Sequence, residues 1–265
     1  MDASRKERFA LVTGASRGIG RAIALKLASD GYTVILVSRT ADPNALTKGV
    51  YEVEKTIREG GGKAKICRTD ISLPEEREAL FAFVEKECGS LSLLVNNAGI
   101  EPKQGTALDM DLSVIDTVFD NNLKGPYAIT QYFANRMIAW KEEGKIENGR
   151  IVFITSVQAA LAGRTGVAYK MSKASLSMAA KCFANCLGDY GIPVFEIRPG
   201  VFPTDMCLPH KENVEKTYFD HFLMKRWGDC SEIADLVSYM GEGKLDYATG
   251  SSFDLSGGWT VPRLL

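Results

Sequence analysis

The sequence has few of the residues that metal sites and disulfide scaffolds require. It contains two histidines, and its six cysteines include no Cys-x-x-Cys pair. We therefore expect no metal site, and scattered free thiols are typical of a reducing, cytoplasmic setting. No apolar run approaches the roughly 18 residues of a membrane-spanning helix, and the charged first residues lack the apolar stretch of a signal peptide.

An excess of charge of either sign is also missing. The 265 residues carry a formal net charge of -1, so no overall positive field would attract nucleic acid or an anionic membrane. Hydrophobic residues make up 45% and charged residues 25%, the usual mixture of a globular protein with a full core. No repeat or low-complexity segment divides the chain. We expect one domain over residues 1–265, with a small molecule as its partner and neither nucleic acid nor membrane.

Short apolar runs alternate with helical stretches along the chain. Strands are expected at residues 9–13, 33–37, 63–68, 91–95, 151–155, 192–197 and 252–255. Helices are expected at about 23–30, 44–59, from 74 onward, and at 113–140, 168–188 and 231–240. Most strands are continuously apolar, which is typical of a parallel sheet covered on both faces. The pattern predicts an α/β fold, a doubly wound parallel sheet of the Rossmann type with about seven strands. The irregular segment 202–228 predicts a substrate loop.

The first expected strand ends in a glycine-rich turn that runs from Thr13 to Gly20. Gly14 permits the tight turn, Gly18 allows the backbone to approach a pyrophosphate, and Gly20 allows close helix–strand packing. The helix N-terminus offers N–H groups to the same anion. This context predicts a dinucleotide site, although the spacing is Gly-x-x-x-Gly-x-Gly. The expected cofactor contacts in the turn are Gly14, Ser16, Arg17, Gly18, Ile19 and Gly20.

The end of the second strand predicts which dinucleotide binds. An acidic residue there would bind a ribose 2′-OH, whereas an arginine accommodates a 2′-phosphate. This sequence has Arg39 at that place, and Arg17 adds a second cation. NADP (NADPH) is therefore the expected cofactor and NAD the less favoured one. The alternative is that Arg39 is only a surface charge.

A tyrosine and a lysine four residues apart occur twice in the chain. Tyr169 and Lys173 would share one face of a helix, where the ammonium is expected to lower the phenol pKa from about 10 toward working pH. Tyr169 is then a candidate general acid/base. Tyr51 and Lys55 have the same spacing within a charged stretch typical of a solvated helix face. The spacing alone is therefore not specific.

A hydroxyl at the end of the fifth strand is a candidate partner for Tyr169. Ligands bind at the carboxyl edge of such sheets, and a hydroxyl there can stabilise charge that develops on a carbonyl oxygen. Thr155 and Ser156 are both at this place, and alternation along the strand sends them to opposite sides. The alternative for Ser156 is a helix or turn cap.

Together these motifs resemble the short-chain dehydrogenase/reductase family, in its single-domain branch. The residues that carry the resemblance are the Thr13–Gly20 turn, Asn96-Asn97-Ala98-Gly99, Asn122, Ser156, Tyr169, Lys173, Pro199-Gly200 and Thr204. The end of the chain is similar to proteins labelled 3-ketoacyl-carrier-protein reductases. That likeness rests on Arg226-Trp227-Gly228 and on the stretch from Gly257 to Leu264.

The resemblance implies a role for each matching position. The implied catalytic residues are Asn122, Ser156, Tyr169 and Lys173, where the spacing to Gly125 selects Asn122 over Asn121. The family's further cofactor contacts fall on Asp70, Ile71, Asn97, Ala98, Gly99, Tyr169, Lys173, Pro199, Gly200 and Thr204. The family also implies a homotetramer or homodimer.

The expected function is that of an NADP(H)-dependent oxidoreductase that interconverts a carbonyl and a secondary alcohol, with a 3-oxoacyl thioester as one candidate substrate. Reductases that receive a carrier protein usually present basic residues before the fifth strand and after the following helix. Here those places hold Glu147-Asn148 and Asp189-Tyr190. A sugar, polyol or other small carbonyl substrate therefore remains an alternative, as does a non-catalytic dinucleotide-binding sensor.

Overall fold

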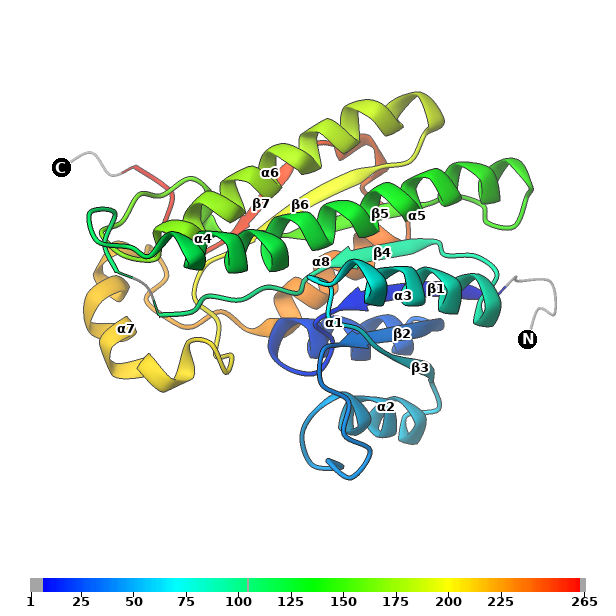
Figure 1. Ribbon diagram of the computed structural model, residues 1–265, viewed down its shortest axis with the longest axis horizontal. Helices are drawn as coiled ribbons and strands as arrows, with labels where there is room; N and C mark the ends of the chain where they lie inside the picture. The colour runs from blue at the N-terminus through cyan, green and yellow to red at the C-terminus, as the bar shows by residue number, and fades with distance from the viewer. Residues whose placement is uncertain (1–6, 104, 263–265) are drawn as a thin grey trace.

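A seven-stranded parallel sheet forms the centre of the computed structural model, which describes residues 7–103 and 105–262 (Figure 1). The strand order is β3-β2-β1-β4-β5-β6-β7, and neighbouring strands pair in parallel. The strands are β1 (Arg8–Thr13), β2 (Tyr32–Ser38), β3 (Lys63–Arg68), β4 (Leu93–Asn96), β5 (Arg150–Ile154), β6 (Val194–Pro199) and β7 (Ser252–Leu255). The predicted doubly wound α/β sheet is confirmed.

Helices cover both faces of the sheet (Figure 1). Their bounds are α1 (Gly18–Ser29), α2 (Val50–Glu59), α3 (Pro74–Glu87), α4 (Leu112–Phe119), α5 (Gly125–Glu142), α6 (Val167–Leu187), α7 (Lys211–Tyr218) and α8 (Cys230–Gly241). Buried side chains of α3, α5 and α6 form one hydrophobic core, and those of α1, α2 and α8 form the other. Along β1, Leu11 faces the first core, while Ala10 and Val12 face the second. This alternation explains why the strand reads as a continuous apolar run.

Two predicted helices differ from those observed. The helix expected from about residue 44 begins at Val50, because Gly49 has a φ of 111°, which an α-helix does not allow. Before it, the Asp42 side chain accepts a hydrogen bond from Asn44 N at 2.9 Å, which favours a turn. The helix expected at 113–140 is divided: α4 and α5 are joined by a π-helical turn, Asp120–Lys124. Such turns are frequent at functional sites, and this one contains Asn122.

The segment after β6 is more ordered than predicted. Residues 211–218 form α7, and aromatic rings pack around it. Trp227 Nε1 donates to Glu215 Oε1 at 2.7 Å, and the rings of Phe222 and Trp259 lie 4.9 Å apart. These contacts join residues far apart in sequence, so helix periodicity alone did not reveal this order. No helix in the described part of the chain is long and apolar enough to cross a membrane.

Candidate active site

The carboxyl end of β1 leads directly into the glycine turn. Gly14 and Gly18 have φ angles of 68° and 53°, in the left-handed region that favours glycine. A Cβ on Gly18 would lie 2.9 Å from Thr204 Cγ2, and one on Gly20 would collide with the Gly14 carbonyl oxygen. The absent side chains leave the N-terminus of α1 open to an anion, so the turn fits a dinucleotide pyrophosphate. The other cofactor contacts predicted in this turn are Ser16, Arg17 and Ile19.

The loop after β4 is bonded to this turn. Thr13 Oγ1 accepts from the backbone N–H groups of Asn97 and Ala98, both at 3.0 Å. Asn97 Nδ2 donates to the Thr13 carbonyl oxygen at 2.9 Å. Next in the loop is Gly99, where a Cβ would lie 3.3 Å from Lys173 Nζ. The ends of β1 and β4 therefore form one connected edge beside Lys173.

The residues predicted at the adenine end lie along the same sheet edge. Arg39 is exposed directly after β2, and Asp70 and buried Ile71 follow β3. Arg17 Nη1 lies 3.2 Å from Asp205 Oδ2, so an ion pair joins the glycine turn to the loop after β6. Arg17 is thus partnered within the chain, whereas Arg39 is open to solvent.

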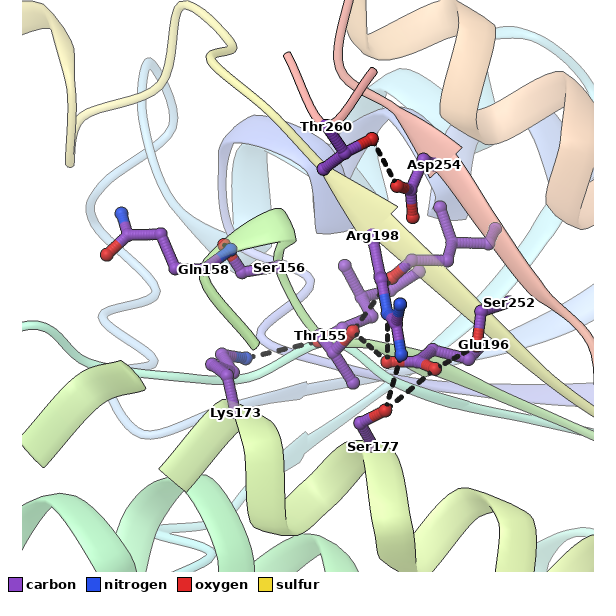
Figure 2. Close-up of polar contacts among 12 residues, drawn as sticks. Thr155, Ser156, Gln158, Lys173, Ser177, Glu196, Arg198, Ser252, Asp254 and Thr260 are labelled. Carbon is purple, nitrogen blue, oxygen red and sulfur yellow. Dashed lines mark hydrogen bonds and ion pairs between the residues drawn. The ribbon is translucent and has the colours of Figure 1, made fainter. Parts of the chain in front are cut away.

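The two hydroxyls that follow β5 have different partners. Thr155 Oγ1 donates to Glu196 Oε1 at 2.6 Å, while Ser156 Oγ accepts from Gln158 N at 3.1 Å (Figure 2). Ser156 therefore caps a short 3-10 turn, the alternative that the sequence left open. The same hydroxyl hydrogen-bonds the Tyr169 phenol in a way that lowers the phenol pKa. Ser156 is thus both a cap and a neighbour of Tyr169.

Tyr169 is buried near the start of α6. Burial raises the pKa of its phenol well above the usual value, and the Glu101 carboxylate raises it further, while Ser156 opposes both. Lys173 Nζ lies 5.6 Å from the centroid of the Tyr169 ring and donates to the Ile154 carbonyl oxygen at 3.1 Å. The phenol pKa is therefore not lowered toward working pH as predicted, because loss of hydration dominates the shift. The phenol is protonated at neutral pH.

Lys173 is itself perturbed by its surroundings. Its side chain is 3% exposed, and burial lowers the pKa of the ammonium to about 8, although the carboxylates of Glu101 and Glu196 oppose this shift. An ammonium with a pKa near working pH can gain and lose a proton during turnover. This property suits a residue in a proton relay.

Asn122 is fully buried within the π-helical turn. Its Oδ1 accepts from Ile100 N at 2.8 Å, and its Nδ2 donates to Ile100 O at 2.9 Å and to Ser172 Oγ at 3.1 Å. The side chain therefore fixes the loop after β4 against α6. Asn121 instead is half-buried, and its Nδ2 donates to the Thr117 carbonyl oxygen of α4.

The end of β6 approaches the glycine turn from the other side. A Cβ on Gly200 would lie 2.7 Å from Ser256 Cα, so the chain passes closely between two segments there. Pro199 is the last residue of β6, and Thr204 then reaches Gly18. The residues predicted to hold the nicotinamide end are therefore next to those predicted to hold the pyrophosphate.

Two carboxylates near the site were missed by sequence reasoning. Glu196 is 2% exposed within β6 and accepts hydrogen bonds from four surrounding side chains, those of Thr155, Ser177, Arg198 and Ser252 (Figure 2). Glu101 lies in the loop after β4. An acidic residue between Phe195 and Ile197, inside an apolar strand, was the available signal for Glu196. Glu101 could have been suspected from its place after the Asn97-Ala98-Gly99 motif.

Most of the chain is similar to known oxidoreductases. Residues 8–215 match the family model described as short chain dehydrogenase. A 3-oxoacyl-[acyl-carrier-protein] reductase of Staphylococcus epidermidis is 30% identical over 251 residues, which are 95% of this chain and 98% of that protein.

Solved structures show the same likeness. A 3-oxoacyl-[acyl-carrier protein] reductase from Brucella melitensis in complex with NAD has a TM-score of 0.89 and 32% identity, and the match covers 98% of this chain and 100% of that chain. A putative 2-deoxy-D-gluconate 3-dehydrogenase from Agrobacterium tumefaciens with bound NADP has a TM-score of 0.84 and 30% identity, with 98% of each chain covered. The chain therefore belongs to the short chain dehydrogenase family, and it is an oxidoreductase that acts on CH–OH groups with a nicotinamide dinucleotide.

Proposed function

We propose that the protein reduces a carbonyl compound to a secondary alcohol with NADPH, and catalyses the reverse oxidation. One observation carries this proposal: the phenol of Tyr169 is buried beside the Ser156 hydroxyl at the edge that also bears the glycine turn. A non-catalytic sensor would have no use for a buried, protonated phenol there. The loop at 202–228, which includes α7, would cover the substrate.

In the proposed mechanism, each side chain acts on the carbonyl oxygen or on the proton that reaches it. Bound NADPH supplies hydride to the carbonyl carbon. Tyr169 donates its phenolic proton to the oxygen, and Ser156 donates a hydrogen bond to the same atom. Lys173, held by the Ile154 carbonyl oxygen, returns a proton to Tyr169. Asn122 fixes the loop after β4 relative to α6, the helix that carries Tyr169 and Lys173.

Charge near the end of β2 supports NADP over NAD. Arg39 is exposed at the place where a 2′-phosphate would lie, and arginine matches phosphate geometry. Lys48 Nζ lies 2.8 Å from Asp205 Oδ2, which also pairs with Arg17, so a second cation lies beside the Arg17 of the glycine turn. The Brucella structure contains NAD and the Agrobacterium structure contains NADP, so these relatives support a nicotinamide dinucleotide, and the proposed preference for NADP rests on Arg39.

The test of this function is oxidation of NADPH that depends on an added carbonyl compound. Arg39→Ala should raise KM for NADPH about tenfold, the effect of losing about 1.4 kcal/mol of phosphate binding, while KM for NADH stays unchanged. Equal effects on both cofactors would contradict the assignment of Arg39. Absence of carbonyl-dependent NADPH oxidation across acyl thioesters, ketoses and simple ketones would contradict the reductase itself.

Two observations bear on substrate. The reductases of Staphylococcus and Brucella are named for 3-oxoacyl carrier-protein substrates, which favours a 3-oxoacyl thioester. Glu147 and Asp189 are exposed acidic residues where an acidic carrier would need basic ones, which favours a small polar carbonyl compound instead.

We also propose that the protein forms a homodimer or homotetramer through α5 and α6. These helices expose Tyr127, Met171 and Met178 to solvent, at 43%, 38% and 58%. Large apolar side chains on adjacent helices are typical of a contact between subunits. Light scattering that gives the mass of a monomer would contradict this proposal.

A further inference from the structure

Glu101 occupies a fixed place beside the candidate catalytic groups. The preceding residue, Ile100, exchanges backbone hydrogen bonds with the Asn122 amide in both directions. Further along the same loop, Thr106 pairs with Thr165 in an isolated antiparallel bridge. The loop that carries Glu101 is therefore tied to the π-helical turn at one point and to the start of α6 at another.

Three polar side chains from three segments converge at Gly166, the residue that precedes α6. A Cβ on Gly166 would lie 3.0 Å from Glu101 Oε1, 3.0 Å from Lys170 Nζ and 3.9 Å from Gln158 Oε1. Gly166 has a φ of 69° and is about one helical turn before Tyr169. The three polar atoms therefore gather around a backbone position about one helical turn before Tyr169.

The Glu101 carboxylate acts on the site electrostatically. It raises the pKa of Tyr169, and it opposes the fall that burial causes in the pKa of Lys173. It also raises the pKa of Cys207, a half-buried thiol in the loop after β6. Burial in turn raises the pKa of Glu101 itself. The Glu101 carboxylate therefore influences groups on α6 and on the loop after β6.

The Gln158 amide oxygen also lacks a partner. This atom is buried and has no hydrogen-bond partner among the residues that the structure describes. Its side chain extends away from the network around Glu196 (Figure 2). A buried acceptor left unsatisfied costs free energy, so a ligand that donates a hydrogen bond to it would be favoured.

We propose that Glu101, Gln158 and Lys170 form a substrate subsite that selects a neutral, hydroxyl-bearing carbonyl compound, such as a ketose. Glu101 disfavours an anionic substrate, and Lys170 disfavours a cationic one. Each hydroxyl group donates one hydrogen bond, so a compound with two or more hydroxyl groups can donate one to the carboxylate and another to the amide oxygen. An acyl chain would leave these groups unpaired, and sites built for hydroxyl groups discriminate strongly against analogues that lack them. This inference rests on the proposed reductase function and chooses between its two candidate substrate classes.

The experiment compares four carbonyl compounds that share a four-carbon acyl or ketone skeleton: erythrulose, butanone, acetoacetate and an acetoacetyl thioester. With NADPH, wild type should give the highest kcat/KM for erythrulose. Glu101→Leu should lower kcat/KM for erythrulose about tenfold or more relative to kcat/KM for butanone, the effect of one lost hydrogen bond to a charged group. Glu101→Gln should retain most erythrulose activity and raise kcat/KM for acetoacetate. Glu142→Leu, at the exposed end of α5, is the matched control and should change neither.

Two outcomes would contradict the proposed subsite without contradicting the reductase activity. One is a higher kcat/KM of wild type for the thioester or butanone than for erythrulose. The other is an equal loss of kcat/KM for all four compounds in Glu101→Leu. If no compound is reduced, the proposed function fails, and binding then tests the subsite. Calorimetry with NADPH-loaded protein should show weaker erythrulose binding to Glu101→Leu than to wild type. Equal binding, or none to either protein, would reject the subsite.

Discussion

The two tyrosine–lysine pairs of this chain share a spacing but have different surroundings. On α2, Lys55 is 53% exposed and forms a 3.7 Å ion pair with Glu59. On α6, Tyr169 and Lys173 are both buried, and Lys173 donates to the end of β5. In the α2 pair the lysine is solvated and Tyr51 is only partly buried against the core, whereas the α6 pair has neighbours from the loops after β4, β5 and β6. Burial, rather than spacing, therefore gives such a tyrosine–lysine pair its chemistry.

The carboxylates next to the two pairs differ in the same way. Glu52 accepts two hydrogen bonds from Arg21, at 2.7 and 3.0 Å, and these bonds lower the pKa of its carboxyl. Burial instead raises the pKa of Glu101, and the more distant ammonium groups of Lys170 and Lys173 only partly oppose it. Ionisation of Glu52 therefore stabilises the fold, whereas ionisation of Glu101 lowers its stability.

Removing the two phenolic hydroxyl groups gives the largest expected contrast. Tyr169→Phe should lower kcat by about 10²–10⁴-fold, the usual contribution of a general acid, and leave NADPH binding intact. Tyr51→Phe should leave kcat unchanged. Steady-state kinetics and NADPH fluorescence titration measure the two effects. Similar kcat values for both variants would remove the functional difference between the pairs.

Substitution of the two lysines should give a smaller contrast in rate. Lys173→Met should lower kcat about a hundredfold, the scale of a misplaced catalytic group. Lys55→Met should have no effect on rate.

Stability provides a second measurement for Lys173. Its pKa is about 8 in the folded state against an ordinary value of 10.5, so the unfolded chain binds more protons between these values. Wild type should therefore gain stability relative to Lys173→Met as pH rises through this window. A pH-independent difference in Tm would show that the ammonium is not perturbed by burial.

The carboxylates should give the smallest contrast, and its sign differs between the two sites. The pKa of Glu52 is lowered in the folded state, so wild type should be more stable than Glu52→Gln at neutral pH. If the charge contributes ~1 kcal/mol, the difference in Tm is about 2–4 °C. This difference should vanish as pH falls through the pKa of Glu52 in the folded state. The folded pKa of Glu101 is raised. Wild type should therefore lose stability relative to Glu101→Gln as pH rises above the ordinary value of 4.5.

Thermal unfolding from about pH 3 to pH 8 would measure both carboxylate effects. Glu54→Gln is a suitable control on α2, because Glu54 forms its ion pair with Arg58 within the same helix. If Glu52→Gln and Glu101→Gln shifted stability in the same direction, the contrast between the two regions would not hold.

Local signals in the sequence predicted much of the fold and several parts of the candidate site. Continuous apolar runs identified the strands, and the glycine turn predicted a dinucleotide site, because both patterns depend on adjacent residues. The start of α2 at Val50 and the order of the 202–228 segment were not predicted. Their causes are a glycine with positive φ and aromatic contacts between Tyr218, Phe222 and Trp259.

The sequence by itself determined where the phenol, the hydroxyl and the ammonium would occur along the chain. The protonation of these groups and the residues that surround them follow from the tertiary structure alone. The pKa of Tyr169 follows from burial and from Glu101, which comes from a separate loop. Solvation and electrostatics depend on all groups close in space, and sequence separation does not limit which groups those are. The spacing of Tyr169 and Lys173 is therefore a property of one helix, while their chemistry is a property of the folded chain.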